Sequence, residues 1–130
     1  MVIRPSWLPY DQGPDEIVLD IDPKQAFGTG THATTRLALV LLEDNLRPGE
    51  SVQDVGCGTG VLSVAARKLG AGAIRAVDND SVAVVTTRDN LDRNGIQEDV
   101  EVLQADRPMP WKADVVVANI LADVLIDLAP

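Results

Sequence analysis

Residues 52–66, VQDVGCGTGVLSVAA, join an apolar strand directly to an alanine-rich helix through three glycines at alternate positions. Glycines let the backbone adopt turns and close approaches that side chains forbid. In open α/β sheets, ligands bind at the carboxyl ends of the strands, where such a turn would stand. This segment therefore predicts a mainly parallel sheet with a ligand site at the turn, although a plain tight turn would also use glycines.

Strands and helices alternate along most of the chain. Helical spacing of apolar residues, with Leu37, Val40 and Leu41 among them, and short apolar runs set the expected elements. The expected helices are residues 34–46, 59–69 and 81–94, and the expected strands are residues 17–21, 51–55, 73–77, 100–104 and 114–118. Such alternation forms right-handed crossovers. We predict a Rossmann-like, doubly wound, mainly parallel α/β fold, with order 3-2-1-4 for the four strands after residue 50.

The length and hydrophobicity indicate a single core. The chain has 130 residues, of which 45% are hydrophobic, and this can bury one core. We expect a lead-in arm over residues 1–22 and a cofactor-binding domain over residues 23–130. Three prolines, Pro5, Pro9 and Pro14, oppose regular structure in the part of the arm before the strand expected at residues 17–21.

Charge and cysteine content exclude several classes of protein. The net charge is −9 and the eleven Lys and Arg residues are scattered, which argues against direct nucleic-acid binding. The single Cys57 excludes an intramolecular disulfide. No leader and no long apolar run is present, so we expect a cytoplasmic protein that does not enter membranes. No metal site is predicted.

The glycine spacing separates two kinds of nucleotide site. A dinucleotide fingerprint is G-x-G-x-x-G, whereas this chain has G-x-G-x-G. Asp54, two residues before the first glycine, would repel a pyrophosphate but would suit a cationic or amino-bearing ligand. Asp78 ends the next strand about 20 residues on, where an acid can accept both ribose hydroxyls. Adenosine without pyrophosphate fits best. An aspartate there is often only a turn residue, and Asp80 or Ser81 is expected to cap the next helix.

Five segments together carry a resemblance to a known family. They are, in order, AFGTGTHATT, DVGCGTGVLSVAARKLGA, AVDNDSVAV, DNLDRNG and ADVVVANILADVLIDLAP. The glycine turn is similar to that of the class I S-adenosylmethionine-dependent methyltransferases. The combination of FGTGTH with ANILA resembles, more specifically, the bacterial ribosomal protein L11 methyltransferases, which methylate amino groups of a large-subunit ribosomal protein.

The resemblance implies a cofactor and a set of site residues. The cofactor is S-adenosylmethionine, and the residues implied to bind it are Thr35, Gly56, Gly58, Asp78 and Asn119. Asn119 is also the implied catalytic residue, because its amide oxygen, with the carbonyl of Ile120, can accept hydrogen bonds from an amine and orient it. For Thr31 and Thr34 helix capping is the preferred interpretation. His32 is expected to form a hydrogen bond within its own turn.

The resemblance also has consequences for the whole molecule. Family members carry a separate N-terminal substrate-recognition domain and continue beyond residue 130. The resemblance therefore implies a chain truncated at both ends and a fold that is incomplete at its C-terminal side. The outer edge of the fourth strand, residues 114–118, is then expected to lack a regular partner, and the chain is expected to self-associate through this edge or to shield it in another way. Two alternatives stay open: a cofactor-binding or interaction module without activity, and a nicotinamide-dependent oxidoreductase, which the glycine spacing disfavours.

Overall fold

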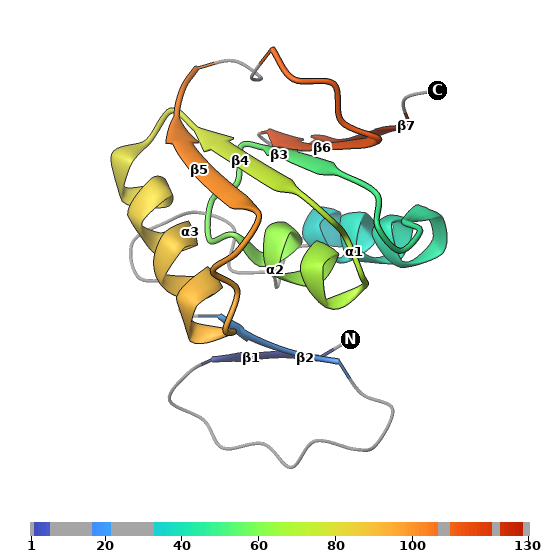
Figure 1. Ribbon diagram of the computed structural model, residues 1–130. Coiled ribbons are helices and arrows are strands. Elements are labelled where there is room, and N and C mark those ends of the chain that lie inside the picture. The colour runs from blue at the N-terminus through green and yellow to red at the C-terminus, as the bar shows by residue number, and fades with distance from the viewer. Residues whose placement is uncertain (1, 6–16, 22–32, 107–109, 121–122, 129–130) are drawn as a thin grey trace.

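The computed structural model describes residues 2–5, 17–21, 33–106, 110–120 and 123–128 (Figure 1). The helices are α1 (Ala33–Asn45), α2 (Val61–Lys68) and α3 (Ser81–Arg93). The strands are β1 (Val2–Pro5), β2 (Val18–Ile21), β3 (Val52–Val55), β4 (Ile74–Asp78), β5 (Val100–Gln104), β6 (Val115–Ile120) and β7 (Asp123–Leu128). Every helix and strand predicted from the sequence is confirmed, with ends that differ by one or two residues. The strands β1 and β7 were not expected.

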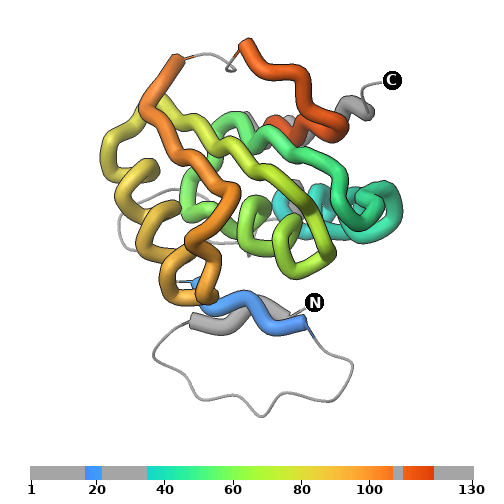
Figure 2. The backbone as a smooth tube through the Cα atoms, viewed as in Figure 1, coloured from blue at the N-terminus to red at the C-terminus, as the bar shows by residue number. Residues whose placement is uncertain are grey.

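The main sheet has the order β5-β4-β3-β6-β7. Its first four strands are parallel, so the predicted order 3-2-1-4 and the Rossmann-like α/β class are confirmed. Figure 2 follows the chain from β3 outward to β5 and then back across to β6. The three helices lie on one face of this sheet (Figure 1), so the second helical layer of a doubly wound fold is not found among the described residues.

The outer edge of β6 is paired, and the expectation of an open edge is therefore wrong. The strand β7 runs antiparallel to β6, from Val115 opposite Leu128 to Ile120 opposite Asp123. The physical reason is that an apolar edge strand leaves N–H and C=O groups without partners, and the apolar segment that follows it folds back to supply them. The chain thus shields this edge itself, which is one of the two expected outcomes, and self-association stays a prediction.

The lead-in arm contains regular structure, so the expectation that its prolines exclude it is also wrong. The strand β1 pairs in parallel with β2, and Pro5 is its last residue, where a missing N–H is tolerated in an edge strand. Leu19 and Ile21 of β2 belong to the core cluster. The helices thus lie between the five-stranded sheet and the two-stranded sheet (Figure 1).

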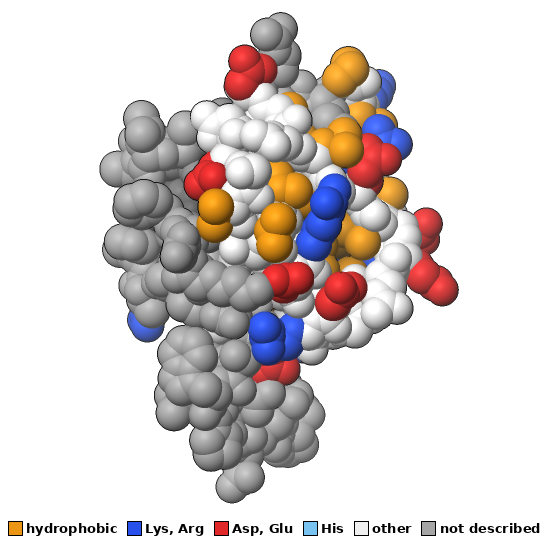
Figure 3. Space-filling model, turned by 90° about the vertical axis from the view of Figure 1, so that its left-hand side faces the viewer, with side chains coloured by type: hydrophobic (Ala, Val, Ile, Leu, Met, Phe, Trp, Pro, Cys, Tyr) orange, Lys and Arg blue, Asp and Glu red, His pale blue; other side chains and the backbone are white. Residues whose placement is uncertain are grey.

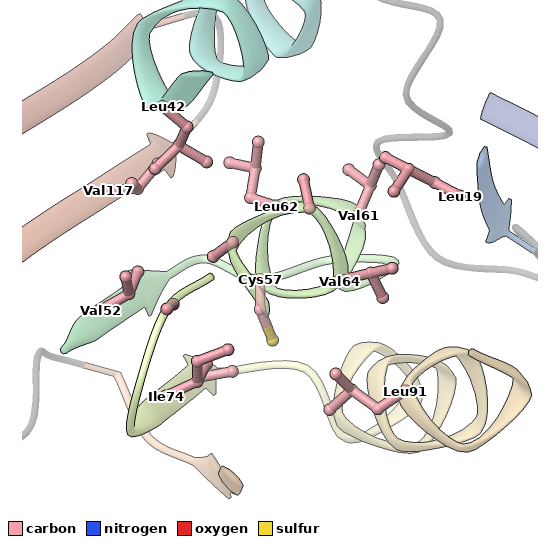
Figure 4. Packing of buried hydrophobic residues seen from close by; sticks show 14 of the residues in the cluster. Leu19, Leu42, Val52, Cys57, Val61, Leu62, Val64, Ile74, Leu91 and Val117 are labelled. Atoms are coloured by element: carbon pink, nitrogen blue, oxygen red, sulfur yellow. The ribbon is translucent and has the colours of Figure 1, made fainter. Parts of the chain in front are cut away.

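The helix α2 occupies the centre of the core. Its residues from Val61 to Ala66 are all buried. Figure 4 shows Leu62 directed toward Leu42 of α1 and Val117 of β6, while Val61 lies beside Leu19 of β2. Because the glycine turn leads directly into this buried helix, the turn is attached to a closely packed part of the fold.

Candidate functional site

Three predicted site residues stand at one level along the sheet. Val55, the last residue of β3, is level with the residues that immediately precede Asp78 in β4 and Asn119 in β6. Gly56, which follows Val55, therefore stands between Asp78 and Asn119 at the carboxyl edge of three adjacent strands. The chain leaves β3 toward β4 on one side and later returns to β6 on the other. This is the topological switch point at which open α/β sheets bind ligands.

The glycine turn has the backbone that its sequence predicts. Gly56, Gly58 and Gly60 have φ angles of 75°, 56° and 84°, in the left-handed region that side chains disfavour. The amides of Gly56 and Cys57 both donate to the carbonyl oxygen of Val77, at 2.8 and 3.0 Å, and the Gly60 amide donates to the Cys57 carbonyl at 2.7 Å. The turn therefore folds over the end of β4.

Asp78 contacts this turn with its side chain. Its Oδ2 atom accepts a hydrogen bond from the Gly58 amide at 3.0 Å, and its Oδ1 atom accepts one from the Asp80 amide at 2.9 Å. Each carboxylate oxygen keeps further acceptor capacity, so ribose hydroxyls can still be bound. Asp80 caps α3, because its Oδ1 atom accepts from the Val82 amide at 2.9 Å. The predicted helix cap is confirmed, while the ribose contact of Asp78 stays a prediction.

Asp54 lies beneath the turn and is completely buried. Its Oδ2 atom accepts a hydrogen bond from the Ser63 hydroxyl at 2.7 Å, and its Oδ1 atom has no partner among the described residues. Burial raises the pKa of Asp54 from 3.8 to about 6, the Ser63 hydrogen bond opposes this rise, and the nearby charge of Asp78 adds to it. A buried acceptor without a partner suits a ligand that brings a cationic or N–H group.

Two polar residues of α3 also contact the turn, and neither was predicted. The Thr87 hydroxyl donates to the Gly58 carbonyl oxygen at 3.0 Å and lies 3.2 Å from the Cys57 sulfur. The Asn90 side-chain amide donates to the Thr59 carbonyl oxygen at 2.8 Å. Both side chains are fully buried. A pair of polar residues three apart on the buried side of a helix is the signal that could have identified them.

Thr35 and Asn119 are the remaining predicted site residues. Thr35 lies in the first turn of α1 and is 1% exposed. Asn119 stands in β6 opposite Val124 of β7, and its side chain lies outside the described residues. The FGTG segment (residues 27–30), Thr31, His32 and the side chain of Thr34 also lie outside the described residues. The cofactor contacts of Thr35 and Asn119 stay predictions.

A separate pocket of about 210 Å³ lies between α3 and β5, lined by residues such as Arg88, Ile96 and Val100. Figure 3 shows this side of the molecule, where hydrophobic side chains surround basic ones. The pocket includes the amino end of β5, whereas the predicted site residues stand at carboxyl ends of strands. It is therefore distinct from the candidate site.

Within the described ranges, no helix has the length and apolar character needed to cross a membrane.

Comparison with known proteins gives one family. The family model described as "Ribosomal protein L11 methyltransferase (PrmA)" matches residues 1–130. Ribosomal protein L11 methyltransferases from Caldanaerobacter subterraneus subsp. tengcongensis and Streptococcus uberis are each 51% identical to the chain, over 100% and 98% of its length. These matches cover 42% and 41% of the two relatives, so the chain spans less than half of their length.

A solved structure agrees with this match. The crystal structure of a ribosomal protein L11 methylase from Lactobacillus delbrueckii subsp. bulgaricus superposes with a TM-score of 0.82 at 36% identity, over 92% of this chain and 62% of that chain. The family match over the whole chain, the similar relatives and the shared fold lead to one conclusion. The chain belongs to the ribosomal protein L11 methyltransferase family.

Proposed function

We propose that this chain carries the cofactor-binding part of an S-adenosylmethionine-dependent protein N-methyltransferase whose substrate is ribosomal protein L11, a protein of the large ribosomal subunit. The match to the family model over residues 1–130 carries this proposal. The position of Asp78 and the glycine turn at the switch point supports it. A cytoplasmic location belongs to the same proposal, because the substrate is a ribosomal protein.

The chemistry of the site fits S-adenosylmethionine, which contains an adenosine and an amino group but no phosphate. The segment 52–66 contains no Lys or Arg to balance a pyrophosphate, and the carboxylates of Asp54 and Asp78 would repel one. Asp78 is suited to accept hydrogen bonds from ribose hydroxyls. The buried Oδ1 atom of Asp54 has no partner among the described residues, which suits an ammonium group.

The proposed reaction is a direct transfer of a methyl group. When bound, S-adenosylmethionine supplies a sulfonium methyl group. The lone pair of a neutral substrate amine forms the new N–C bond as the C–S bond breaks, the electron pair stays on sulfur, and the methylated ammonium loses a proton to water. A lysine amine has a pKa near 10.4 and must first be deprotonated. In this proposal Asn119, with the Ile120 carbonyl, accepts hydrogen bonds from the amine and directs its lone pair at the methyl carbon.

Calorimetric titration of the chain with S-adenosylhomocysteine, S-adenosylmethionine and NAD tests the proposal. We expect the first two to bind and NAD not to bind. A chain that binds only NAD would be assigned to the nicotinamide-dependent oxidoreductases, and a chain that binds none of the three would contradict the cofactor assignment. Transfer of a labelled methyl group to ribosomal protein L11 then separates an active enzyme from a module that only binds the cofactor.

A further inference from the structure

We propose that Thr87 and Asn90 of α3 are positioning residues, which hold the carbonyl groups of the glycine turn toward α3 and thereby fix the turn in the shape that binds the cofactor. This inference rests on the proposed function for the identity of the cofactor. The contacts themselves stand on the geometry of the described residues.

Thr87 fixes one peptide group of the turn. Its hydroxyl donates to the Gly58 carbonyl oxygen at 3.0 Å. In a trans peptide the C=O and the following N–H point in opposite directions. Holding the Gly58 carbonyl toward α3 therefore turns the Thr59 N–H away from α3. Because Gly58 has a φ of 56° and no side chain, little else in its own structure restricts this peptide.

Asn90 fixes the next peptide group in the same way. Its amide donates to the Thr59 carbonyl oxygen at 2.8 Å, and both partners are buried. The Gly60 N–H is thereby directed away from α3 as well, and it donates to the Cys57 carbonyl at 2.7 Å. Two successive peptides are thus oriented from one helix. A buried carbonyl that loses such a donor keeps its desolvation cost, so the turn is expected to shift when either donor is removed.

The helix α3 approaches the turn closely at Thr87. A Cβ atom built on Gly60 would lie 2.9 Å from the Cγ2 atom of Thr87 and 3.1 Å from its Cα atom. Thr87 therefore contacts the turn twice, through its packing against Gly60 and through its hydrogen bond to Gly58. This makes Thr87 the more informative of the two positions to change.

The helix also offers a matched control in Asn94, one turn beyond Asn90. Its side-chain amide donates to the Asp20 and Asn90 carbonyl oxygens at 2.8 and 2.7 Å, and its Oδ1 atom accepts from the Asp20 amide at 3.0 Å. These contacts attach β2 to α3. Removing them affects stability without removing a contact to the turn.

The test compares Thr87→Val, which keeps the shape and removes the hydroxyl, with Thr87→Ser, which keeps the hydroxyl, and with Asn94→Ala. Hydrogen exchange of the Gly58 and Gly60 amides is measured by NMR without ligand, together with S-adenosylhomocysteine affinity and the melting temperature. We expect about tenfold faster exchange at both amides and about tenfold weaker binding for Thr87→Val. Thr87→Ser is expected to retain both properties, and Asn94→Ala is expected to lower only the melting temperature.

Two results would overturn the inference. One is unchanged exchange at Gly58 and Gly60 in Thr87→Val. The other is a loss of affinity in Asn94→Ala as large as that in Thr87→Val, because the effect would then follow stability alone. The exchange measurement needs no ligand, so it decides whether Thr87 positions the turn even if the parent chain fails to bind S-adenosylhomocysteine. That failure would count against the proposed function instead.

Discussion

The carboxylate of Asp78 accepts a hydrogen bond from the Gly58 amide at 3.0 Å, 20 residues earlier in the chain. The side chain that is proposed to bind the ribose therefore also holds the glycine turn against the end of β4. Its second oxygen accepts from the Asp80 amide at 2.9 Å. Because these hydrogen bonds join groups of the protein itself, they hold the site in one arrangement, and such preorganisation lowers the entropic cost of binding.

Replacing Asp78 by alanine is expected to weaken S-adenosylhomocysteine binding by about 1.5–3 kcal/mol, the usual range for hydrogen bonds to a charged group, without unfolding the protein. Calorimetric titration measures the change. Asp80→Asn is the matched control, because it removes a neighbouring charge and keeps an oxygen for the Val82 amide. Equal affinities of the Asp78→Ala variant and the parent would show that the ribose is bound elsewhere.

Asn119→Ala is expected to reduce methyl transfer more than cofactor affinity, because the proposed role of this residue is to orient the amine. A loss of orientation costs about 100-fold in rate, whereas the cofactor keeps its proposed contacts with Asp78 and the glycine turn. The rate is measured with ribosomal protein L11 as substrate, in a protein of the length of the curated relatives. Losses of equal size in rate and affinity would argue against the orienting role.

The positions of the four parallel strands and of the glycine turn were predictable, because each depends on residues close in sequence. The helix α1 shows where such reasoning fails. Leu37 and Val40 were expected on its apolar stripe, yet they are 54% and 52% exposed, while Ala38, Leu39 and Leu42 are buried. Residues 37–42 of this helix are apolar at every position, so steps of three and four residues fit either face. Contacts with the rest of the core decide which face is buried.

The two features missed at the site and at the sheet edge have a similar cause. The pairing of β7 with β6 depends on how the chain reverses, which local apolar patterns do not specify. Thr87 and Asn90 were missed because polar residues in a helix are usually solvent-exposed. Only the proximity of α3 to the turn shows that they bond its carbonyl groups.

Gly60→Ala is expected to destabilise the protein by about 3 kcal/mol, since it adds overpacking against Thr87 to the cost of a positive φ. Gly60 has a φ of 84° and its Cβ would meet Thr87 at 2.9 Å. Gly95→Ala provides the control, with a φ of 72° and nothing within 4 Å of the added carbon, and is expected to cost about 1 kcal/mol. Urea unfolding measures both. Similar losses would show that the contact with Thr87 is relieved.

Cys57 is expected to react slowly with thiol reagents in the folded protein. Burial raises the pKa of its thiol well above the usual range, and the charge of Asp54 adds to this rise. The thiolate is the reactive form, so at pH 8 the folded protein should react at least about 100-fold more slowly than the protein unfolded in guanidinium chloride. The remaining reaction of the folded protein requires local opening of the structure around Cys57. Absorbance of the released aromatic thiolate gives the rate. A rate equal to that of the unfolded chain would contradict the burial of Cys57.

The last prediction concerns the pH dependence of stability through Asp54. Its pKa is about 6 in the folded protein, against a usual value of 3.8. Between these two values the folded state binds the proton that the unfolded state has lost. Raising the pH through this window therefore lowers the free energy of unfolding, by about 3 kcal/mol in total. Asp54→Asn removes this contribution, so the variant is expected to be more stable than the parent at pH 7.5 and about equal to it at pH 4.

Comparison of the two unfolding curves at each pH isolates Asp54, because the other carboxylates titrate in both proteins. Ser63→Ala is an independent check, because the Ser63 hydrogen bond lowers the pKa of Asp54. Its loss should move the pH-dependent change in stability to higher pH.

The pH dependence of cofactor binding provides a second measurement of the same group. If ionised Asp54 faces the ammonium group, S-adenosylhomocysteine affinity should rise through pH 6 in the parent, and in Asp54→Asn it should be weaker and independent of pH in this range. If the free energy of unfolding depends on pH in the same way in the parent and in Asp54→Asn, then Asp54 does not titrate in this window.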